Sequence, residues 1–480
     1  MSGLSIKDRI KIPRHKAPEQ SPGVRSRNFE EVCLGFGLEE AKEEALRCIE
    51  CPKPSCVAGC PVGIDIPRFV KLVGEGAILE AAHVLKEKNI LPAICGRVCP
   101  QEKQCEQSCV IGRRTEPVSI GKIERFVADF ERLSGRVELP KSGASTGCSV
   151  AIVGSGPAGI TGAFELARLG HRVTLFEAMH KPGGVLYYGI PRFRLPSDVI
   201  ESELKALEYL GVEIFKDAVI GKALSIEDIF KMGYDSILLG TGAGLPKMLG
   251  IPGENLVGVY SANEWLTRLN LMRADLFPAY ATPIEYGKNI VVIGAGDAAM
   301  DGARTSIRLQ PEAVTLVYRR SRAEAPCRVE ELHHAEEEGV KTRFLTSPVR
   351  FIGDSHYKLK AIEVMEMALG EPDSSGRRRP IPIEGSNWTI ECDTAIIALG
   401  CDINPLVTRS TPGLELTKSG IVVVNTETGM SSIPGLFAAG DVITGGSTVI
   451  SAMGQAKVAA KGIHDYLVAK KGLRLQYAAV

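Results

Sequence analysis

The sequence has no long hydrophobic run and no net charge, and these absences narrow what the protein can be. Its longest apolar stretches, such as residues 236–239 and 395–399, have only the length of a strand, so no transmembrane helix is predicted. Lysine plus arginine and aspartate plus glutamate each number 57, so no overall field draws the chain to nucleic acid or an anionic membrane. The opening MSGLSIKDRIKIPRHK has no apolar signal-peptide region. We therefore expect a cytoplasmic protein of two or three domains.

Cysteine, by contrast, is plentiful and unevenly distributed. Eight of the 13 cysteines fall in two short runs, residues 48–60 and 95–109. Cys60 and Cys99 are each followed directly by proline. Each iron of a cubane cluster takes one soft ligand from the protein, and closely spaced thiolates supply such ligands. The two runs therefore predict iron–sulfur clusters.

Disulfide bonds and structural zinc are the alternative uses of these cysteines. Secreted disulfide frameworks usually occur in short chains behind a signal peptide, whereas this chain has 480 residues. Paired C-x₂₋₄-C elements also form closed Cys₄ zinc sites, so zinc is the stronger rival. The prolines at 61 and 100, and the flavin and nicotinamide patterns described below, favour a redox role. We therefore prefer iron–sulfur over zinc.

Helical patterns surround the cysteine runs. Apolar residues recur at spacings of three and four in several segments of the first part of the chain. These segments are residues 38–48, 66–75, 77–88 and 120–133. The residues before them are polar and contain proline, and the run GRVELPKSGASTG that follows them has the composition of a linker. We expect an N-terminal arm at 1–30, a helical iron–sulfur domain at 31–135 and a linker at 136–147.

A different pattern of strand, glycine loop and helix follows the linker. The run SVAIVGSGPAG, residues 149–159, places three glycines between a strand and a helix. Gly154 allows a tight turn, Gly156 lets the backbone approach a pyrophosphate, and Gly159 lets the helix pack on its strand. Glu177 closes the second strand, where its carboxylate can accept a hydrogen bond from a ribose hydroxyl. A glycine turn without a ligand does not explain the complete pattern, which predicts a dinucleotide site.

The pattern recurs in the run NIVVIGAGDAAMD, residues 289–301, with Gly294 and Gly296 in the loop. At the end of its second strand the ribose-binding acid is absent, and Arg319 and Arg320 occupy its place. A carboxylate there would repel a 2′-phosphate, whereas guanidinium groups bind it through charge-assisted hydrogen bonds. An exposed basic turn is the alternative interpretation of the two arginines. We therefore predict NADP(H) at the second site and FAD at the first.

Two further strands end in glycine, residues 234–242 and 392–400, and they look like crossings between a flavin domain and an inserted nicotinamide domain. Near the C-terminus, Gly440 and Asp441 end a strand that can reach the flavin, and Thr448 precedes an apolar helix whose N-terminus can face it. The predicted fold is α/β, with a helical N-terminal domain followed by two Rossmann-like domains of the glutathione-reductase type. Their expected bounds are 148–250 and 396–480 for FAD and 251–395 for NADP(H).

Beyond these patterns, several segments carry a resemblance that covers nearly the whole chain. They are Arg9–Arg14, Arg27–Glu31, the cysteine array, Gly154–Gly159, Pro182–Gly184, Tyr188–Pro191, Phe193–Pro196, Tyr318–Arg320 and Ala439–Asp441. The combination resembles the small subunit of NADPH-dependent glutamate synthase and the N-terminal part of dihydropyrimidine dehydrogenase. It most resembles the NADPH-binding large (alpha) subunit of electron-bifurcating NADH-dependent reduced ferredoxin:NADP⁺ oxidoreductase, also called a sulfide dehydrogenase subunit. The segments RIKIPR, PEQ and RNFEE favour that subunit over the glutamate synthase one.

The resemblance implies a ligand set that spacing alone leaves open. One [4Fe–4S] cluster would be held by Cys48, Cys51, Cys56 and Cys109. The other would be held by Cys60, Cys99, Cys105 and, at a non-cysteine position, Glu124. Cys95 would then be spare. The alternative is that Cys95 is the ligand and that Glu124 is a surface residue of its helix.

The glycine patterns and the resemblance together imply the residues that contact the nucleotides. For FAD they are Gly154, Gly156, Pro157, Ala158, Gly159, Glu177, Gly184, Arg194, Thr241, Gly242, Gly440, Asp441, Thr448 and Val449. For NADP(H) they are Gly294, Gly296, Asp297, Arg319 and Arg320. Transfer of hydride and electrons between cofactors requires no side-chain acid, base or nucleophile, so we expect no catalytic residue.

We expect the chain to exchange hydride between NADP(H) and FAD and to pass single electrons through two [4Fe–4S] clusters, because a flavin handles both one and two electrons. A thioredoxin-reductase-like enzyme is not favoured, since neither nucleotide domain contains C-x-x-C. A non-catalytic scaffold that binds no cofactor is an alternative of another class. The intact glycine loops and cysteine runs argue against it.

The sequence contains no evident second substrate site, so a partner subunit is expected. In the bifurcating family the partner would carry FAD and a [2Fe–2S] cluster, and ferredoxin would take the other electron. The alternative partner is the large subunit of glutamate synthase. Hydrogenase and formate dehydrogenase assemblies are a third possibility.

Overall fold

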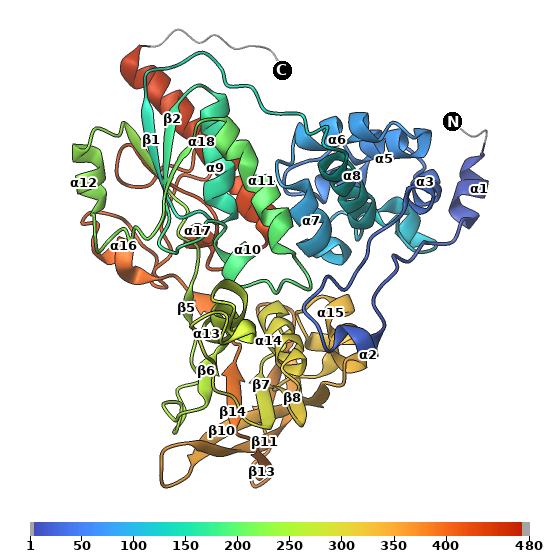
Figure 1. Cartoon of the computed structure of the whole chain (residues 1–480), viewed down its shortest axis with the longest axis vertical. Helices are drawn as coiled ribbons and strands as arrows, with labels where there is room; N and C mark the ends of the chain where they lie inside the picture. Colours follow the sequence, from blue (N-terminus) through green and yellow to red (C-terminus); the bar gives the residue numbers. More distant parts are fainter. Residues whose placement is uncertain (1–3, 473–480) are drawn as a thin grey trace.

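The N-terminal domain of the computed structural model, which describes residues 4–472, is built of short helices around an apolar core (Figure 1). Its helices are α1 (Ile6–Lys11), α2 (Pro22–Arg25), α3 (Leu38–Leu46), α4 (Ser55–Ala58), α5 (Ile66–Glu75), α6 (Ile78–Lys86), α7 (Pro92–Val98), η1 (Gln101–Lys103), η2 (Val110–Arg113) and α8 (Ile120–Ser134). The helices α3, α5, α6 and α8 lie within two residues of the predicted bounds. The sequence did not predict α4 or α7, because they are too short for a periodic pattern to appear.

The helix α5 illustrates why these segments are helical. The side chain of Asp65 accepts a hydrogen bond from the backbone N–H of Arg68, and Pro67 lies in the first turn. Gly76 ends the helix in the left-handed region, at φ +81°. The buried residues of α5 are Ile66, Phe69, Val70 and Val73, and they join the core formed with α3, α6 and α8.

The first α/β domain has a parallel five-stranded sheet in the order β16-β4-β1-β2-β3. Its strands are β1 (Ser149–Val153), β2 (Arg172–Phe176), β3 (Glu213–Phe215), β4 (Ser236–Leu239) and β16 (Leu436–Ala438). All of β1 is buried, as expected for a central strand covered on both faces. The helices are α9 (Pro157–Arg168), α10 (Val185–Tyr188), α11 (Ser197–Tyr209), α12 (Ile226–Lys231), α16 (Pro405–Arg409), α17 (Asp441–Thr444) and α18 (Val449–Lys471). Of these, α9 and α18 pack against each other.

The second α/β domain lies between β4 and β16 in the chain and repeats this architecture, with the sheet order β6-β14-β7-β8-β9. Its strands are β6 (Val259–Ser261), β7 (Asn289–Ile293), β8 (Ala313–Tyr318), β9 (Lys341–Phe344) and β14 (Thr394–Ile397). Its helices are α13 (Ala262–Leu266), η3 (Thr267–Leu271), η4 (Ala274–Leu276), α14 (Asp297–Arg308), η5 (Arg322–Glu324) and α15 (Val329–Glu337).

The chain crosses between the two α/β domains at a short two-stranded ribbon. Its strands β5 (Leu245–Pro246) and β15 (Cys401–Asp402) pair antiparallel. The boundary expected between residues 395 and 396 falls inside β14, which pairs with β6 and β7 of the second domain. The chain therefore leaves the second domain a few residues later than expected.

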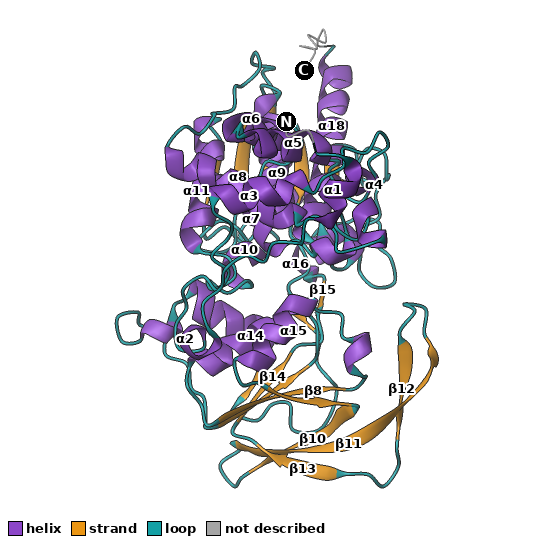
Figure 2. Cartoon of the chain, turned by 90° about the vertical axis from the view of Figure 1, so that its right-hand side faces the viewer, coloured by secondary structure: helices purple, strands orange, loops and turns teal. Residues whose placement is uncertain are grey.

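An antiparallel sheet, which the sequence did not predict, is attached to the second α/β domain (Figure 2). It consists of β10 (Thr346–Gly353), β11 (Leu359–Pro372), β12 (Arg378–Pro382) and β13 (Trp388–Glu391). The predicted fold class is confirmed by the remaining architecture, a helical domain and two α/β domains of which one is inserted in the other. In the described residues, no helix combines the length and the apolar character needed to span a bilayer.

The three domains meet at one junction. In Figure 1 the helical domain lies beside the first α/β domain, and the second α/β domain lies below both. The N-terminal arm runs down from α1 so that α2 lies next to α15. Arg25 of α2 is buried there and pairs with Glu337 (2.5 Å) and Glu338 (3.1 Å). The arm therefore ties the helical domain to the second α/β domain.

Candidate functional site

The loop between β1 and α9 has the shape that a pyrophosphate requires. A Cβ on Gly154, at φ +99°, would lie 2.6 Å from the carbonyl oxygen of Gly240. A Cβ on Gly159 would lie 1.8 Å from the carbonyl oxygen of Gly154. A Cβ on Gly156, in contrast, would meet no protein atom within 4 Å. The open face of Gly156 at the N-terminus of α9 therefore fits the pyrophosphate of FAD, whose phosphates the helix dipole also favours.

Two other predicted FAD residues surround this loop. The buried carboxylate of Glu177, directly after β2, accepts hydrogen bonds from the backbone N–H of Ser155 (2.9 Å) and of Met179 (2.8 Å). Gly184 begins α10 at φ +54°, and a Cβ there would lie 2.8 Å from the Cα of Gly156. The structure thus brings Glu177, Gly184 and the glycine loop together.

The remaining predicted FAD residues, apart from Arg194, belong to loops and helix starts at the same edge of the sheet. Thr241 and Gly242 follow β4, Gly440 and Asp441 follow β16, and Thr448 and Val449 begin α18. Pro157 and Ala158 open α9, and a Cβ on Gly440 would lie 2.9 Å from the Cβ of Ala158. Burial raises the pKa of Asp441 above its usual value. Parallel strands place their carboxyl ends together, which explains why these distant segments converge.

Arg194, which was also predicted to contact FAD, pairs with carboxylates of the second α/β domain. Its Nη1 is 2.7 Å and 2.8 Å from the two carboxylate oxygens of Asp301, and its Nε is 3.2 Å from Glu331 Oε1. Burial alone would lower the pKa of Arg194, but the two carboxylates raise it above the usual value. Because these partners belong to α14 and α15, Arg194 joins the first α/β domain to the second.

The second glycine loop has the same shape as the first. A Cβ on Gly294, at φ +133°, would lie 2.3 Å from the carbonyl oxygen of Ala398, whereas a Cβ on Gly296 would meet no protein atom within 4 Å. The side chain of Asp297 accepts a hydrogen bond from the backbone N–H of Arg328 (2.9 Å) and so fixes the segment before α15. The open face of Gly296 at the start of α14 fits a second pyrophosphate.

The two arginines after β8 lie in different environments. Arg319 is exposed, whereas Arg320 is buried. The guanidinium of Arg320 donates from Nη2 to Asp373 Oδ2 (2.6 Å) and from Nε to the carbonyl oxygen of Arg378 (2.8 Å). An exposed basic turn is therefore excluded for Arg320, whereas the exposure of Arg319 is compatible with both interpretations.

The four cysteines expected to hold the first cluster surround one cavity. Cys48, Cys51, Cys56 and Cys109 line it together with apolar residues such as Ile66 and Val118, all from the N-terminal domain. Burial, reinforced by the charges of neighbouring thiolates, raises the pKa of Cys48 to about 11 and that of Cys56 to about 12. Such thiols become thiolates when a metal replaces the proton, so this donor set fits an iron–sulfur cluster.

A second group contains Cys60, Cys99, Cys105 and Glu124. Burial raises the pKa of Cys105, and the charges of Glu106, Glu124, Cys99 and Cys60 raise it further. Glu124 is 5% exposed, so it is not a surface residue of α8. Burial raises the pKa of Glu124 to about 8, although a hydrogen bond from Asn89 Nδ2 to its Oε1 (2.6 Å) acts in the opposite direction. A buried group of thiols and a carboxylate also fits a bound metal cluster.

Cys95 lies beside this second group. Its Sγ is 3.7 Å from Asn89 Oδ1. The hydrogen bond with Cys99 and burial raise the pKa of Cys95, and the charges of Cys99 and Glu124 raise it further. Sequence reasoning missed Asn89, which contacts both Cys95 and Glu124. In the sequence Asn89 stands in an ordinary turn before Pro92, so no local signal identifies it.

The second cysteine group lies against the first α/β domain. Gln104, directly before Cys105, donates from Nε2 to Thr448 Oγ1 at the start of α18 (3.2 Å). The Sγ of Cys95 is 3.7 Å from the Sδ of Met453, and a Cβ on Gly454 would lie 2.9 Å from the carbonyl oxygen of Pro61. The loops that carry Cys60 and Cys105 therefore contact the helix that begins at the expected FAD site.

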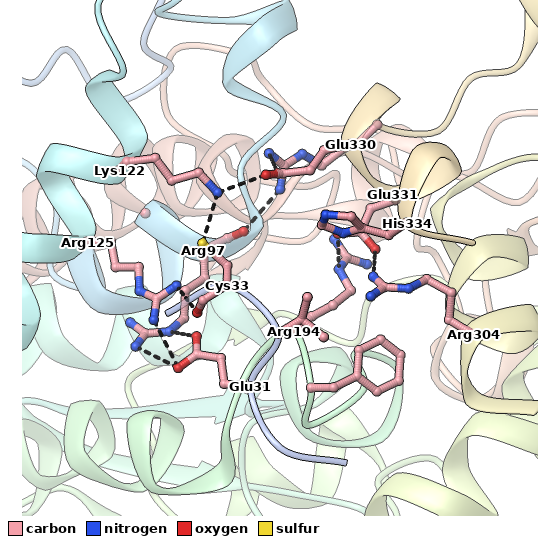
Figure 3. Close-up of a pocket in the computed structure, with 14 residues that line it drawn as sticks. Glu31, Cys33, Arg97, Lys122, Arg125, Arg194, Arg304, Glu330, Glu331 and His334 are labelled. Carbon is pink, nitrogen blue, oxygen red and sulfur yellow. Dashed lines mark hydrogen bonds and ion pairs between the residues drawn. The ribbon is translucent and has the colours of Figure 1, made fainter. Parts of the chain in front are cut away.

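A charged pocket fills the junction of the three domains (Figure 3). Its cations already have carboxylate partners: Glu31 lies 2.7 Å from Arg97 and 3.1 Å from Arg125, and Glu331 pairs with both Arg194 and Arg304. The pocket is therefore an ion-pair network between domains and not an anion-binding site.

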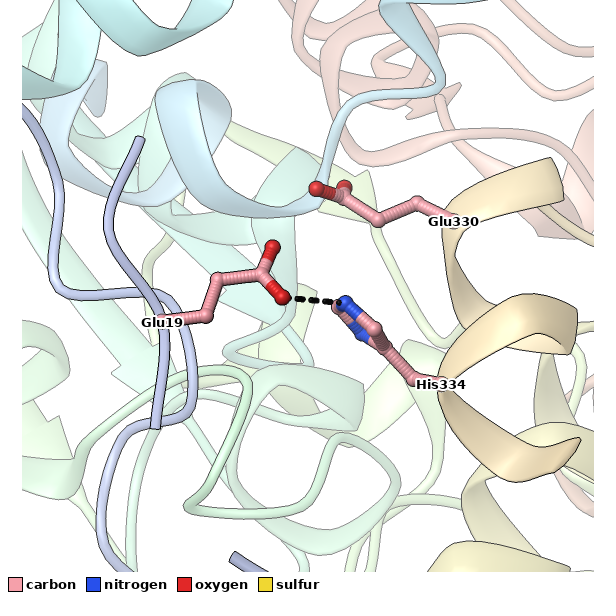
Figure 4. A group of neighbouring side chains, drawn as sticks. All are labelled: Glu19, Glu330 and His334. Atoms are coloured by element: carbon pink, nitrogen blue, oxygen red, sulfur yellow. Dashed lines mark hydrogen bonds and ion pairs between the residues drawn. The ribbon is translucent and has the colours of Figure 1, made fainter. Parts of the chain in front are cut away.

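Glu19, Glu330 and His334 also lie at this junction, with one ligand atom of each within 4.8 Å of the others (Figure 4). The carboxylate of Glu330 forms ion pairs with Lys122 (3.0 Å) and Arg328 (3.0 Å). The carboxylate of Glu19 forms an ion pair with Arg25 (3.3 Å). Cations of the chain already neutralise these carboxylates. The group belongs to the ion-pair network and does not need a metal ion.

Comparisons with known proteins agree with this arrangement. Residues 25–136 match the family described as dihydropyrimidine dehydrogenase domain II, 4Fe-4S cluster, and residues 148–460 match pyridine nucleotide-disulphide oxidoreductase. The glutamate synthase [NADPH] small chain of Azospirillum brasilense is 36% identical over 470 residues, which are 97% of each chain. The NADP(+)-dependent formate dehydrogenase subunit beta of Moorella thermoacetica is 35% identical over 86% of this chain and 60% of that subunit.

Solved structures show the same fold. Mycobacterium tuberculosis FprA in complex with NADPH is 21% identical, with a TM-score of 0.56 over 68% of this chain and 86% of FprA. The matched families account for the 4Fe-4S and the flavin and pyridine nucleotide chemistry predicted from the sequence. The relatives favour the glutamate synthase alternative over the bifurcating interpretation of the sequence. The chain belongs to the glutamate synthase small-chain family of NADPH-dependent FAD and iron–sulfur oxidoreductases.

Proposed function

We propose that this chain is the electron-transfer subunit of a complex in which NADPH supplies electrons to a partner through FAD and two iron–sulfur clusters. The observation that carries the proposal is the contact of the second cysteine group with α18. It connects the expected FAD site to the Cys60 group, and the Cys48 group then lies within the helical domain beyond it. The proposed route therefore runs from the nucleotide site through the Cys60 group to the Cys48 group, whose four cysteines are half-buried.

The residues of the chain bind and orient the cofactors. When bound, FAD exchanges a hydride with the nicotinamide and single electrons with [4Fe–4S] clusters, which carry one electron at a time. Gly156 and Gly296 would admit the two pyrophosphates, Glu177 would accept from a ribose hydroxyl, and Arg319 would meet a 2′-phosphate. Cys48, Cys51, Cys56 and Cys109 would hold one cluster, and Cys60, Cys99, Cys105 and Glu124 the other.

The cofactor content can be measured directly on protein purified without oxygen. We expect one flavin and about eight irons per chain, because each cubane holds four irons. We also expect NADPH to bleach the flavin absorbance in a stopped-flow mixing experiment. A colourless protein without iron would overturn the proposal and support a scaffold function.

For the partner we propose a glutamate synthase large chain, because the small chains of that enzyme match this chain over almost its whole length. Isolation of the native complex under anaerobic conditions identifies the partner. The complex should then form glutamate from glutamine and 2-oxoglutarate with electrons from NADPH. A co-purifying subunit without glutamine amidotransferase features would contradict this assignment.

The N-terminal arm favours a second candidate, the bifurcating complex. Arg9 donates from Nη1 to the carbonyl oxygen of Cys48 (2.6 Å), and Arg14 pairs with Glu106 beside Cys105 (2.6 Å). These arm residues carry the resemblance to the bifurcating subunit, and they support both cysteine groups. If the isolated partner carries FAD and [2Fe–2S], the complex should reduce NADP⁺ only when NADH and reduced ferredoxin are both present.

A further inference from the structure

We propose that the tip of the β11–β12 hairpin, residues 373–379, completes the 2′-phosphate subsite of the second α/β domain and that Arg378 determines the preference for NADP(H) over NAD(H). This inference rests on the proposed binding of NADP(H) by that domain. The hairpin tip would thus join the glycine loop and Arg319 in the nucleotide site, although it is distant from both in the sequence. None of the sequence patterns predicted its participation.

The hairpin reaches the subsite because β11 is long. Its first half pairs with β10 and β13, and its second half, from Met367 to Pro372, pairs only with β12. Figure 2 shows β12 leaving the sheet of β10, β11 and β13 and turning toward the upper half of the molecule. A nucleotide-binding sheet does not require this extension of β11 and β12. The contacts that the tip of the hairpin makes therefore indicate what the extension does.

The turn at the tip has a defined conformation. The backbone N–H of Asp373 donates to the carbonyl oxygen of Arg377 (2.8 Å), and Asp373 Oδ1 accepts from the N–H of Ser375 (2.9 Å). Gly376 takes the left-handed conformation at φ +77° that closes the turn. The positions of Asp373 and Arg378 are therefore fixed relative to each other.

The tip holds the buried arginine after β8. Asp373 Oδ2 and the carbonyl oxygen of Arg378 accept the Nη2 (2.6 Å) and Nε (2.8 Å) donors of Arg320. These two bonds use part of the guanidinium fork and fix its plane, and the remaining N–H groups stay available for an oxyanion. A guanidinium held in one orientation loses less entropy on binding a phosphate than a mobile one.

The tip also adjusts the charge of the subsite. Residues 373–379 contain one acid and three arginines, Arg377, Arg378 and Arg379. Arg378 Nε is 2.8 Å from Glu324 Oε1 in η5, close to the end of β8. Without Arg378, the carboxylate of Glu324 would lose a cation that screens it from a phosphate carrying a charge of about −2. Arg378 therefore acts on binding through Glu324 as well as through its own charge.

Arg379 provides a matched control. Neighbouring residues on a strand point to opposite faces, so Arg378 and Arg379 of β12 share their charge and their exposure but not their direction. Arg378→Ala and Arg379→Ala therefore change the net charge of the hairpin equally. Only the first removes the partner of Glu324.

The experiment measures binding of 2′,5′-ADP and of 5′-ADP to the flavin-loaded full chain by calorimetry. For Arg378→Ala we expect the Kd of 2′,5′-ADP to rise about tenfold with that of 5′-ADP unchanged, as for loss of a charge-assisted contact. Arg378→Lys should recover part of the loss, and Arg379→Ala should change neither Kd more than about twofold. Unchanged flavin content and Tm establish that each variant is folded.

Two outcomes overturn the inference in distinguishable ways. If Arg378→Ala and Arg379→Ala have equal effects on 2′,5′-ADP, or if Arg378→Ala weakens both nucleotides alike, the hairpin is only a structural brace. If the wild-type protein binds 2′,5′-ADP no better than 5′-ADP, the NADP(H) assignment itself fails together with the role of the hairpin.

Discussion

Glu124 is the residue on which the ligand set of the second cluster depends, because its charge acts on Cys60 and Cys105 while its rival Cys95 lies beside Cys99. We expect Glu124→Ala to lower the iron content from about eight to about four per chain and to remove one of two cluster signals in EPR. Cys95→Ala, the matched variant in the same pocket, should retain both clusters. Loss of a cluster only in the Cys95 variant would show that the thiol is the ligand.

Gly156 and Gly296 allow a second test with reciprocal controls. Both have ordinary extended backbone conformations and space for a Cβ, so replacement by alanine should leave the unliganded fold unchanged. The added methyl group would lie where a pyrophosphate is expected, and such overpacking costs about 1–3 kcal/mol. We expect Gly156→Ala to weaken FAD binding about tenfold or more and Gly296→Ala to weaken NADP(H) binding by a similar factor.

In this pair each variant controls for the other, because the two loops lie in different domains. Flavin retention after gel filtration and NADP⁺ titration by calorimetry measure the two affinities separately. Equal loss of both ligands in both variants would contradict the assignment of one nucleotide to each loop.

At the scale of elements, the contact between the loop after η1 and the start of α18 joins two sites. Gln104 lies directly before Cys105, and it donates to the hydroxyl of Thr448 that caps α18. We expect Gln104→Ala to leave flavin and iron contents unchanged but to slow cluster reduction several-fold. The variant lacks a hydrogen bond, worth about 1 kcal/mol, that fixes the position of the loop relative to the helix. Stopped-flow absorbance separates flavin reduction by NADPH from the later cluster reduction.

Gln107→Ala is the control for that variant, because Gln107 is exposed in the same loop. If both variants slow cluster reduction equally, the loop as a whole is responsible. If Gln104→Ala instead slows flavin reduction, the hydrogen bond positions the nicotinamide and not the clusters.

The elements that the sequence predicted are those with a local signal. The helices α3, α5, α6 and α8 have periodic apolar faces, and both glycine loops follow a buried strand. The environments of Arg194 and Arg320 could not be predicted, since their partners Asp301 and Asp373 are 107 and 53 residues away in the chain. The antiparallel sheet was missed for a related reason. The second α/β domain was predicted from its glycine loop, and that loop gives no information about the strands that follow β9 in the chain.

At the scale of the whole molecule, the N-terminal arm and buried ion pairs hold the three domains in one arrangement. Lys122 of α8 connects the helical domain to α15 through Glu330. Arg328, directly before α15, donates to the carbonyl oxygen of Arg97 and to the side chain of Gln101 in the helical domain. Arg194 connects the first α/β domain to the second. Buried pairs of this kind contribute little net stability, but removal of one partner leaves an uncompensated charge. The junction therefore favours a fixed arrangement of the nucleotide sites and the cysteine groups over independent domains.

Glu338 is the residue at which this arrangement can be tested, because its carboxylate receives Arg25 of the arm (3.1 Å) and Arg304 (2.6 Å) and Arg308 (2.8 Å) of α14. Burial would raise its pKa, but hydrogen bonds from Arg304 and Arg308 hold it at about 2. The stabilisation is therefore complete above the unfolded value of about 4.5 and is lost as the pH falls toward 2. At neutral pH the carboxylate is charged. Its removal takes one negative charge away from three buried arginines, Arg25, Arg304 and Arg308.

We expect Glu338→Gln to destabilise the protein by about 3 kcal/mol, as for other broken buried pairs, and to release the arm. Urea unfolding measures the first effect, and limited proteolysis within residues 14–30 measures the second. Glu336→Gln, in the last turn of the helix that Glu338 caps, is the matched control. Among the described residues the carboxylate of Glu336 pairs only with the exposed Arg322 (2.7 Å), so it should contribute less than about 1 kcal/mol. An arm that stays protected in Glu338→Gln would mean that the contacts of Arg9 and Arg14 with the cysteine loops hold it by themselves, and the junction would then not couple the helical domain to the second α/β domain.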